Sequence, residues 1–129
     1  MRSKPRTTAE KLWHDNIVIF AKESAWLGEM YSGIVKDPYN FQLDHVIGAQ
    51  AKRKVNGVSV KVGEWAVMPI PTEIHDITSN HRLNRTLKPA AYRAEFGNEK
   101  QVWYSFYKAM ESQGYDMPLS DEVIEGILR

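Results

Sequence analysis

The stretch from Phe41 to Gly48 most strongly constrains what this chain can fold into. It reads Phe-Gln-Leu-Asp-His-Val-Ile-Gly, an apolar run that places Asp44 and His45 side by side. A short apolar run of this kind predicts a β-strand. A second apolar run over residues 65–70, with prolines at its end, predicts another strand. Two short strands are therefore expected around the centre of the chain.

A helix is expected directly after the second strand. Thr72 belongs to the residue types that favour the N-cap position. The helix would run to about Ser79 and place His75 one turn in. His81 follows six residues later. It would lie about 240° around an unbroken helix, so it joins His75 only if the helix breaks near Asn80.

Residues 49–61 separate the two strands and contain a turn signal of their own. Asn56-Gly57 predicts a tight turn between two valine-containing flanks, so a small hairpin arm is expected there. The cluster Lys52-Arg53-Lys54 lies beside this turn. It could be a solvated loop, but an arm that contacts phosphate groups explains the charge of this region better.

Helices are also expected on both sides of this centre. Thr7 and Glu10 have the spacing of a capping box, which favours a helix start. The expected helices span residues 8–30, 90–113 and 121–128, the second with a kink at Gly97. His14 is interpreted as a surface or partly packed residue of the first helix, not as a ligand.

The length and composition limit the classes of protein. At 129 residues the chain is expected to form a single domain, with a helical extension over 1–40, a core over 41–88 and C-terminal helices over 89–129. The absence of Cys excludes disulfides and Cys-bound zinc, and it fits a cytosolic protein. No apolar run approaches the roughly 20 residues that a membrane helix needs. The first six residues are basic but lack the apolar stretch of a signal peptide.

The net charge of +1 conceals a basic segment. Residues 41–93 contain eight Lys or Arg and four Asp or Glu, a net charge of +4, whereas residues 94–129 contain three and seven, a net charge of −4. A basic site attracts a polyanionic substrate, although such charge swings are also common in small proteins. The basic side chains expected to contact such a polyanion are Lys52, Arg53, Lys54, Arg82 and Arg85.

The acidic and imidazole groups of this segment suit the hydrolysis of a phosphodiester. One divalent cation held by Asp44 and His75 would neutralise charge on the phosphate and stabilise the leaving oxygen. The neutral imidazole of His45 would take a proton from water, and the backbone carbonyl after it or a nearby Asn would orient the ring. His81 could be a third ligand. Alternation separates Asp44 from His45, so the strand must bend or end there, as Gly48 permits, for both to approach one ion.

These segments resemble the HNH or ββα-metal (His-Me finger) nucleases. The resemblance rests on Leu43-Asp44-His45-Val46-Ile47-Gly48, on residues 65–71 and on His75, and it covers about residues 41–100. Within that superfamily the chain is most similar to phage-encoded recombination-promoting nucleases. The resemblance implies an α+β fold with a ββα-metal core flanked by helices, with His45 as the base and Asp44 and His75 as metal ligands.

The resemblance also implies a reaction and a setting. It implies a metal-dependent DNA endonuclease or nickase, encoded by a phage or prophage, that acts in recombination in the cytoplasm of a bacterial cell. Its partners would be DNA and recombination proteins, with no membrane, and it would be a monomer or homodimer. Mg²⁺ or Mn²⁺ suits two protein ligands completed by water, whereas Zn²⁺ would require His81 as well.

One departure from the family pattern keeps two alternatives open. Ser79 stands where the helix of the family often carries a second His, four residues after the first. This departure favours a non-catalytic module, in which a degenerate site on the same fold binds DNA or a recombination protein. The other alternative is a small structural or interaction protein whose histidines are incidental.

Overall fold

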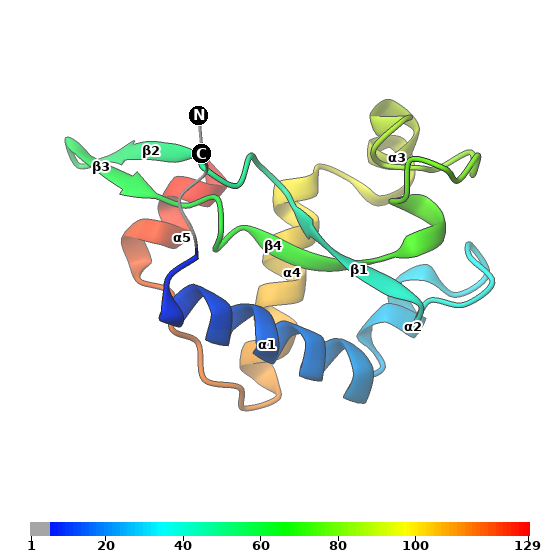
Figure 1. Ribbon diagram of the computed structural model, residues 1–129, viewed down its shortest axis with the longest axis horizontal. Coiled ribbons are helices and arrows are strands. Elements are labelled where there is room, and N and C mark those ends of the chain that lie inside the picture. The colour runs from blue at the N-terminus through cyan, green and yellow to red at the C-terminus, as the bar shows by residue number, and fades with distance from the viewer. Residues whose placement is uncertain (1–5) are drawn as a thin grey trace.

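The computed structural model describes residues 6–129, in which helices pack around two small antiparallel sheets (Figure 1). Its elements are α1 (Thr8–Glu23), α2 (Trp26–Tyr31), β1 (Phe41–His45), β2 (Lys52–Val55), β3 (Val58–Lys61), β4 (Val67–Pro71), the 3-10 turn η1 (Thr72–Ile74), α3 (Pro89–Phe96), α4 (Glu99–Ser112) and α5 (Asp121–Leu128). This content confirms the expected α+β class. Residues 1–5, which include most of the basic start, lie outside the described residues.

The two strands expected around the centre of the chain pair with each other. β1 and β4 are antiparallel, with Asp44 opposite Met68 and His45 opposite Val67. β1 already ends at His45, and β4 continues through both of its prolines to Pro71, so the expected strand ends were wrong at both places. A two-stranded sheet tolerates these prolines because each strand has a free edge on which no N–H is needed.

The inserted arm confirms the expected hairpin. β2 and β3 pair on either side of Asn56 and Gly57. The φ angles of these two residues are 52° and 80°, the left-handed values that a tight two-residue hairpin turn requires. Figure 1 shows the arm extending to one side of the β1–β4 pair, with α5 packed against it.

The core that supports β4 is formed by α1 and α4. Both helices pack against β4, and Figure 1 shows α4 crossing behind the strands while α1 runs along them. The large side chains at the centre of this packing are Trp13, Phe20, Met68, Trp103, Phe106 and Met110, all fully buried. The aromatic side chains of α4 therefore belong to the core. Every residue of β4 is buried, which fixes β1 and its Asp-His pair against a packed layer.

Two of the expected helices are interrupted. The first divides into α1 and α2 because the chain leaves helical geometry at Ser24, whose side chain accepts a hydrogen bond from the N–H of Trp26. The second divides into α3 and α4 because Gly97 takes a φ of 98° and Asn98 then caps the new helix. The expected kink at Gly97 is therefore a break. The last helix, Asp121–Leu128, has the expected bounds.

The helix expected from Thr72 to Ser79 is wrong. Only the single 3-10 turn Thr72–Ile74 forms. The carboxylate of Asp76 accepts hydrogen bonds from the N–H and the hydroxyl of Thr78, which favours a turn over a continuing helix. The carbonyls of Asp76 and Ser79 accept from the side-chain amide of Asn84. Residues 75–88 thus form a loop that folds back on η1, and this loop determines what surrounds His75.

Candidate functional site

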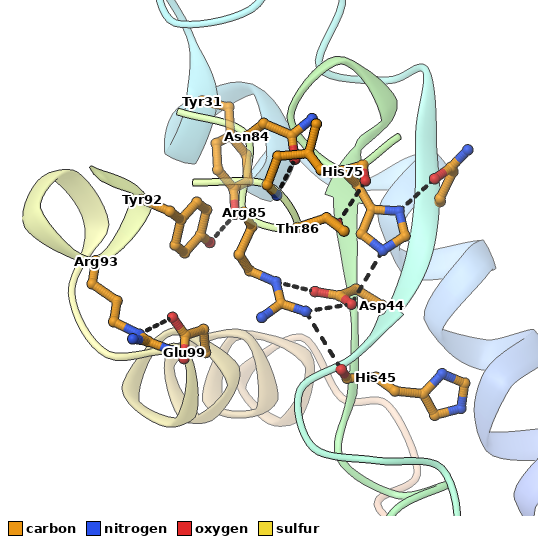
Figure 2. A network of polar contacts seen from close by, with 12 residues as sticks. Tyr31, Asp44, His45, His75, Asn84, Arg85, Thr86, Tyr92, Arg93 and Glu99 are labelled. Atoms are coloured by element: carbon orange, nitrogen blue, oxygen red, sulfur yellow. Dashed lines mark hydrogen bonds and ion pairs between the residues drawn. The ribbon is translucent and has the colours of Figure 1, made fainter. Parts of the chain in front are cut away.

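Asp44 and His75 converge, as the sequence predicts. Nε2 of His75 lies 3.2 Å from Oδ1 of Asp44. The carboxylate is also bound by Arg85, whose Nη2 donates to Oδ1 at 2.6 Å while Nε pairs with Oδ2 (Figure 2). Among residues 6–129, Oδ2 of Asp44 and Nε of Arg85 have no hydrogen-bond partner other than this contact with each other. Arg85 of the same chain therefore neutralises the charge of the Asp44 carboxylate.

Burial and charge act in opposite directions on this pair. Burial alone would raise the pKa of the Asp44 carboxyl, but its contacts with His75 and Arg85 outweigh burial and hold the pKa below its ordinary value. Burial would likewise lower the pKa of Arg85, but the hydrogen bond and charge of Asp44 raise it. Both groups are thus held in their charged forms.

The loop after η1 positions both partners of Asp44. The N–H of Arg85 donates to the carbonyl of Ile74 at 2.7 Å, and the hydroxyl of Thr86 donates to the carbonyl of His75 at 2.7 Å. The ring of His75 is oriented from the other side, because its Nδ1 contacts the side-chain amide oxygen of Gln42 on β1. This contact makes Nδ1 the donor and leaves Nε2 to face Asp44.

Two buried tyrosines lie beside Arg85. The hydroxyls of Tyr31 and Tyr92 hydrogen-bond to each other at 2.8 Å, and both side chains are fully buried. Burial raises the pKa of Tyr92 to about 12 and raises that of Tyr31 well above its ordinary value. Figure 2 shows this pair beside Arg85. Both hydroxyls are thus held in their neutral forms.

His45 points to the opposite face of β1. Its Nε2 contacts Oε1 of Glu64, and its ring lies 6.1 Å from that of His14, centroid to centroid. Figure 2 shows the His45 ring directed away from Asp44 and Arg85. The bend that would bring Asp44 and His45 to one ion is not observed, because β1 keeps its alternation up to its last residue. Glu64 takes the orienting role that was expected of a backbone carbonyl or an Asn.

Glu64 is the centre of this second cluster. It is 5% exposed, and Arg6 Nε lies 3.9 Å from its Oε2. Its backbone carbonyl accepts from Nε2 of His14 at 2.6 Å, while Nδ1 of His14 accepts from the guanidinium of Arg6 at 2.6 Å. Gly63 makes this possible, because a Cβ there would lie 2.2 Å from the carbonyl oxygen of Gly48. The β3–β4 connection can therefore approach the end of β1 closely enough to place Glu64 beside His45.

Sequence reasoning missed Glu64 and assigned His14 incorrectly. His14 is 4% exposed, and burial lowers the pKa of its ring. Its position could have been found, because it lies on the same face of α1 as the buried Glu10 and Ile17, at helical spacing. Glu64 had no comparable signal, since it lies in a turn and meets His45 only through the tertiary fold.

The remaining expected site residues lie elsewhere. His81 donates from Nε2 to the carbonyl of Ile34 at 2.9 Å and accepts at Nδ1 from the N–H of Leu83 at 3.0 Å. Both of its ring nitrogens are thus bound by main-chain groups, and the expected third ligand is engaged with Ile34 and Leu83. Arg82 is exposed in the loop over 75–88. Arg85 was expected to contact DNA, but its side chain is only 15% exposed and is bound to Asp44.

The donor set limits what cation the site can take. Within residues 6–129 no group of three or more His, Asp or Glu side chains is arranged to hold a metal ion. Asp44 and His75 provide two donors on one side of β1. A divalent ion that keeps several waters suits such a pair, whereas tetrahedral zinc held by protein alone does not.

Comparisons of the chain with family models, with curated proteins and with solved structures found no match. None of the helices in the described part of the chain is both long enough and apolar enough to span a bilayer.

Proposed function

We propose that this protein is a metal-dependent nuclease that hydrolyses a phosphodiester bond of DNA. The observation that carries the proposal is the convergence of Asp44 Oδ1 and His75 Nε2, 3.2 Å apart, from a strand and from the turn after its partner strand. The order of these elements, and the resemblance to the HNH or ββα-metal nucleases, support this reaction class. The 3-10 turn at Thr72–Ile74 would stand in place of the helix of that core.

His45 is the proposed base. A carboxylate oxygen can only accept, so the contact with Glu64 makes Nε2 the protonated nitrogen of a neutral ring. The lone pair is then on Nδ1, which can take a proton from water. The side chain is 38% exposed, so water reaches it. Glu64 fixes the tautomer and would stabilise the imidazolium that forms once the proton is taken.

The donors at Asp44 and His75 fit a divalent cation, because a carboxylate oxygen and an imidazole nitrogen at this separation can be neighbouring ligands of one ion. When bound, the cation would neutralise charge on the phosphate and stabilise the leaving oxygen. Arg85 must first release Asp44, since its guanidinium occupies both carboxylate oxygens. The two clusters lie on opposite faces of β1, so the scissile phosphate would lie over the end of this strand, next to His45.

A second candidate function is favoured by the Asp44–Arg85 pair itself. A guanidinium that permanently neutralises Asp44 would leave no role for a cation, and the chain would then bind DNA without cutting it. The separation of His45 from Asp44 on opposite faces supports the same alternative. The two candidates differ in one measurable property, which is strand cleavage.

Nicking of supercoiled plasmid in Mg²⁺ or Mn²⁺ tests the proposal. The parent protein is expected to convert supercoiled to open circular DNA in a reaction that EDTA stops. His45→Ala should lower the rate by about 10²- to 10⁴-fold, the usual contribution of a positioned base. Asp44→Asn should lower the nicking rate at a given Mg²⁺ concentration, because the cation loses its carboxylate ligand. Lys108→Gln, an exposed cation on α4, serves as a control that keeps the parental rate.

Glu64→Gln sharpens the assignment of the base. The amide oxygen can still accept from Nε2 of His45, but the negative charge beside the ring is lost. The nicking rate at a fixed pH should therefore fall, because the imidazolium that forms when His45 takes a proton from water loses the negative charge that stabilises it. Nicking by His45→Ala at the parental rate would refute the catalytic role of His45. DNA binding without any cleavage by the parent would establish the second candidate.

A further inference from the structure

The basic run of the hairpin is divided between two faces. Along β2 the side chains of Lys52 and Lys54 are exposed, whereas Arg53 between them is partly buried and Val55 is buried. Alternation along a strand produces this pattern. Arg53 and Val55 face α5, because a Cβ placed on Gly126 would lie 3.4 Å from Cβ of Arg53 and 3.4 Å from Cγ2 of Val55.

Lys61 joins the two lysines on the outer face. It lies directly opposite Lys52 in the register of β2 and β3, and residues opposite each other in an antiparallel pair share a face. Residues 49–63 contain four Lys or Arg and no Asp or Glu, so no acid within the arm offsets this charge. We call Lys52, Lys54 and Lys61 the lysine face. It is the side of the hairpin that α5 leaves uncovered.

The lysine face is connected to His45 through the start of α1. Nζ of Lys61 lies 3.8 Å from Oε1 of Glu10 in the first turn of that helix. Just before the helix, the guanidinium of Arg6 lies beside Glu64, the partner of His45, and the Arg6 side chain is 45% exposed. Both acids next to this path, Glu10 and Glu64, are buried, so the cations are the groups that solvent meets.

We propose that the lysine face, together with Arg6, binds the phosphate backbone of DNA and leads it to His45. Ammonium groups spaced along an exposed hairpin suit contacts with phosphates, which position a nucleic acid without reading its sequence. The residues involved differ from those that the charge of the sequence alone suggested. Lys61, whose side chain is 28% exposed, and Arg6 are added to the set, whereas the Cβ of Arg53 lies toward α5 and Arg85 is bound to Asp44. This inference takes DNA as the substrate from the proposed function.

Binding of a short fluorescein-labelled DNA duplex, measured by anisotropy in EDTA at several salt concentrations, tests the proposal without requiring cleavage. Each phosphate contact contributes about 0.9 to the slope of log K against log salt. The triple variant Lys52→Gln/Lys54→Gln/Lys61→Gln should therefore lower the slope by about 2 to 3. A matched triple variant on other surfaces, Lys22→Gln/Lys100→Gln/Lys108→Gln, changes the net charge equally and should keep the parental slope.

Two neighbouring residues provide the sharpest control. Lys54→Gln should weaken binding, whereas Arg53→Gln, one residue away on the face toward α5, should leave it at the parental value. Thermal unfolding of each variant checks the fold. Because Lys61→Gln also removes the contact with Glu10, the double variant Lys52→Gln/Lys54→Gln provides the same test without that change, with a slope lower by about 2.

The outcomes separate this inference from the proposed nuclease. Binding that depends on the lysine face, in a protein that never nicks plasmid, supports the inference and removes the nuclease. Nicking by a protein whose two triple variants bind equally well overturns the inference and keeps the nuclease. Equal losses for Lys54→Gln and Arg53→Gln overturn it as well. Retention on phosphatidylserine vesicles, with no binding of DNA, would identify a lipid surface as the polyanion and overturn it too.

Discussion

The two faces of β1 hold polar clusters of different character. On one face Asp44 is 4% exposed and is neutralised by Arg85, with His75 as a further partner. On the other face His45 is 38% exposed in its side chain and has a single carboxylate partner, Glu64. Because side chains alternate along β1, the adjacent residues Asp44 and His45 lie on opposite faces of the strand. Asp44 lies in a buried ion pair, and His45 lies on a partly exposed face, which we call the open face.

This difference indicates what each cluster contributes to the molecule. A buried ion pair fixes its surroundings, because removal of one partner leaves an uncompensated charge in a site that water does not reach. A half-exposed imidazole costs little to remove but can exchange protons with solvent. The Asp44 face is therefore expected to contribute more to stability than the His45 face, whatever part each takes in the proposed reaction.

The largest expected effect is on the Asp44 face. Asp44→Asn leaves the buried guanidinium of Arg85 without its counter-charge and should lower the free energy of unfolding by about 3–5 kcal/mol. His45→Gln, one residue along on the open face, should cost only about 0–1 kcal/mol. Urea unfolding at neutral pH measures both. Equal losses for the two variants would contradict the contrast between the faces.

Acid sharpens the same prediction. Because the pKa of Asp44 is lower in the folded state than in the unfolded chain, its contribution to stability is present above about pH 4 and is lost as the pH falls through the folded value. The difference between the parent and Asp44→Asn should therefore shrink in acid. In the double variant Asp44→Asn/Arg85→Met the buried charge is gone, so it should recover much of the loss at neutral pH.

The next effect concerns the close packing of Gly63 against the backbone of Gly48, which places Glu64 beside His45. A Cβ on Gly63 would lie 2.2 Å from the carbonyl oxygen of Gly48, and backbone must move to accommodate it. Gly63→Ala should therefore lower the free energy of unfolding by about 2–3 kcal/mol. Gly48→Ala is the matched control, because no atom lies within 4 Å of its Cβ position. If both substitutions are tolerated equally, the close approach does not hold the open cluster together.

Local sequence signals predicted the parts of the fold that depend on local interactions. The turn at Asn56-Gly57, the capping box of Thr7 and Glu10 and the helix Asp121–Leu128 are confirmed, because each is decided by residues a few positions apart. The two apolar strands are also confirmed, with different ends, and the structure pairs them with each other. The helix from Thr72 to Ser79 was wrong because Asp76 and Asn84 compete for its backbone groups, and Asn84 comes from outside the segment.

The site was predictable to the extent that β1 and β4 were. Their pairing brings His75 beside Asp44, so the convergence of these two residues followed from the order of elements. The partner that occupies Asp44 did not, since Arg85 reaches it only through the fold of the loop over 75–88. The strand alternation that separates Asp44 from His45 was visible in the sequence, and the structure keeps it to the end of β1. Glu64 required the tertiary approach at Gly63.

The smallest expected effect concerns His14, whose ring contacts the backbone carbonyl of Glu64 behind the open face. Burial lowers the pKa of His14, so the unfolded chain, with a pKa near 6.5, takes up a proton at a higher pH than the folded protein does. Stability should accordingly fall as the pH drops below about 6.5, by no more than about 1.4 kcal/mol per pH unit for this one proton. In His14→Gln the melting temperature should depend less on pH between neutral pH and a pH of about 5.5 than it does in the parent. In Asp44→Asn the melting temperature should change with pH over this range as it does in the parent. A parental slope in His14→Gln would show that the proton is taken up elsewhere and that the buried ring is not what couples α1 to the open cluster.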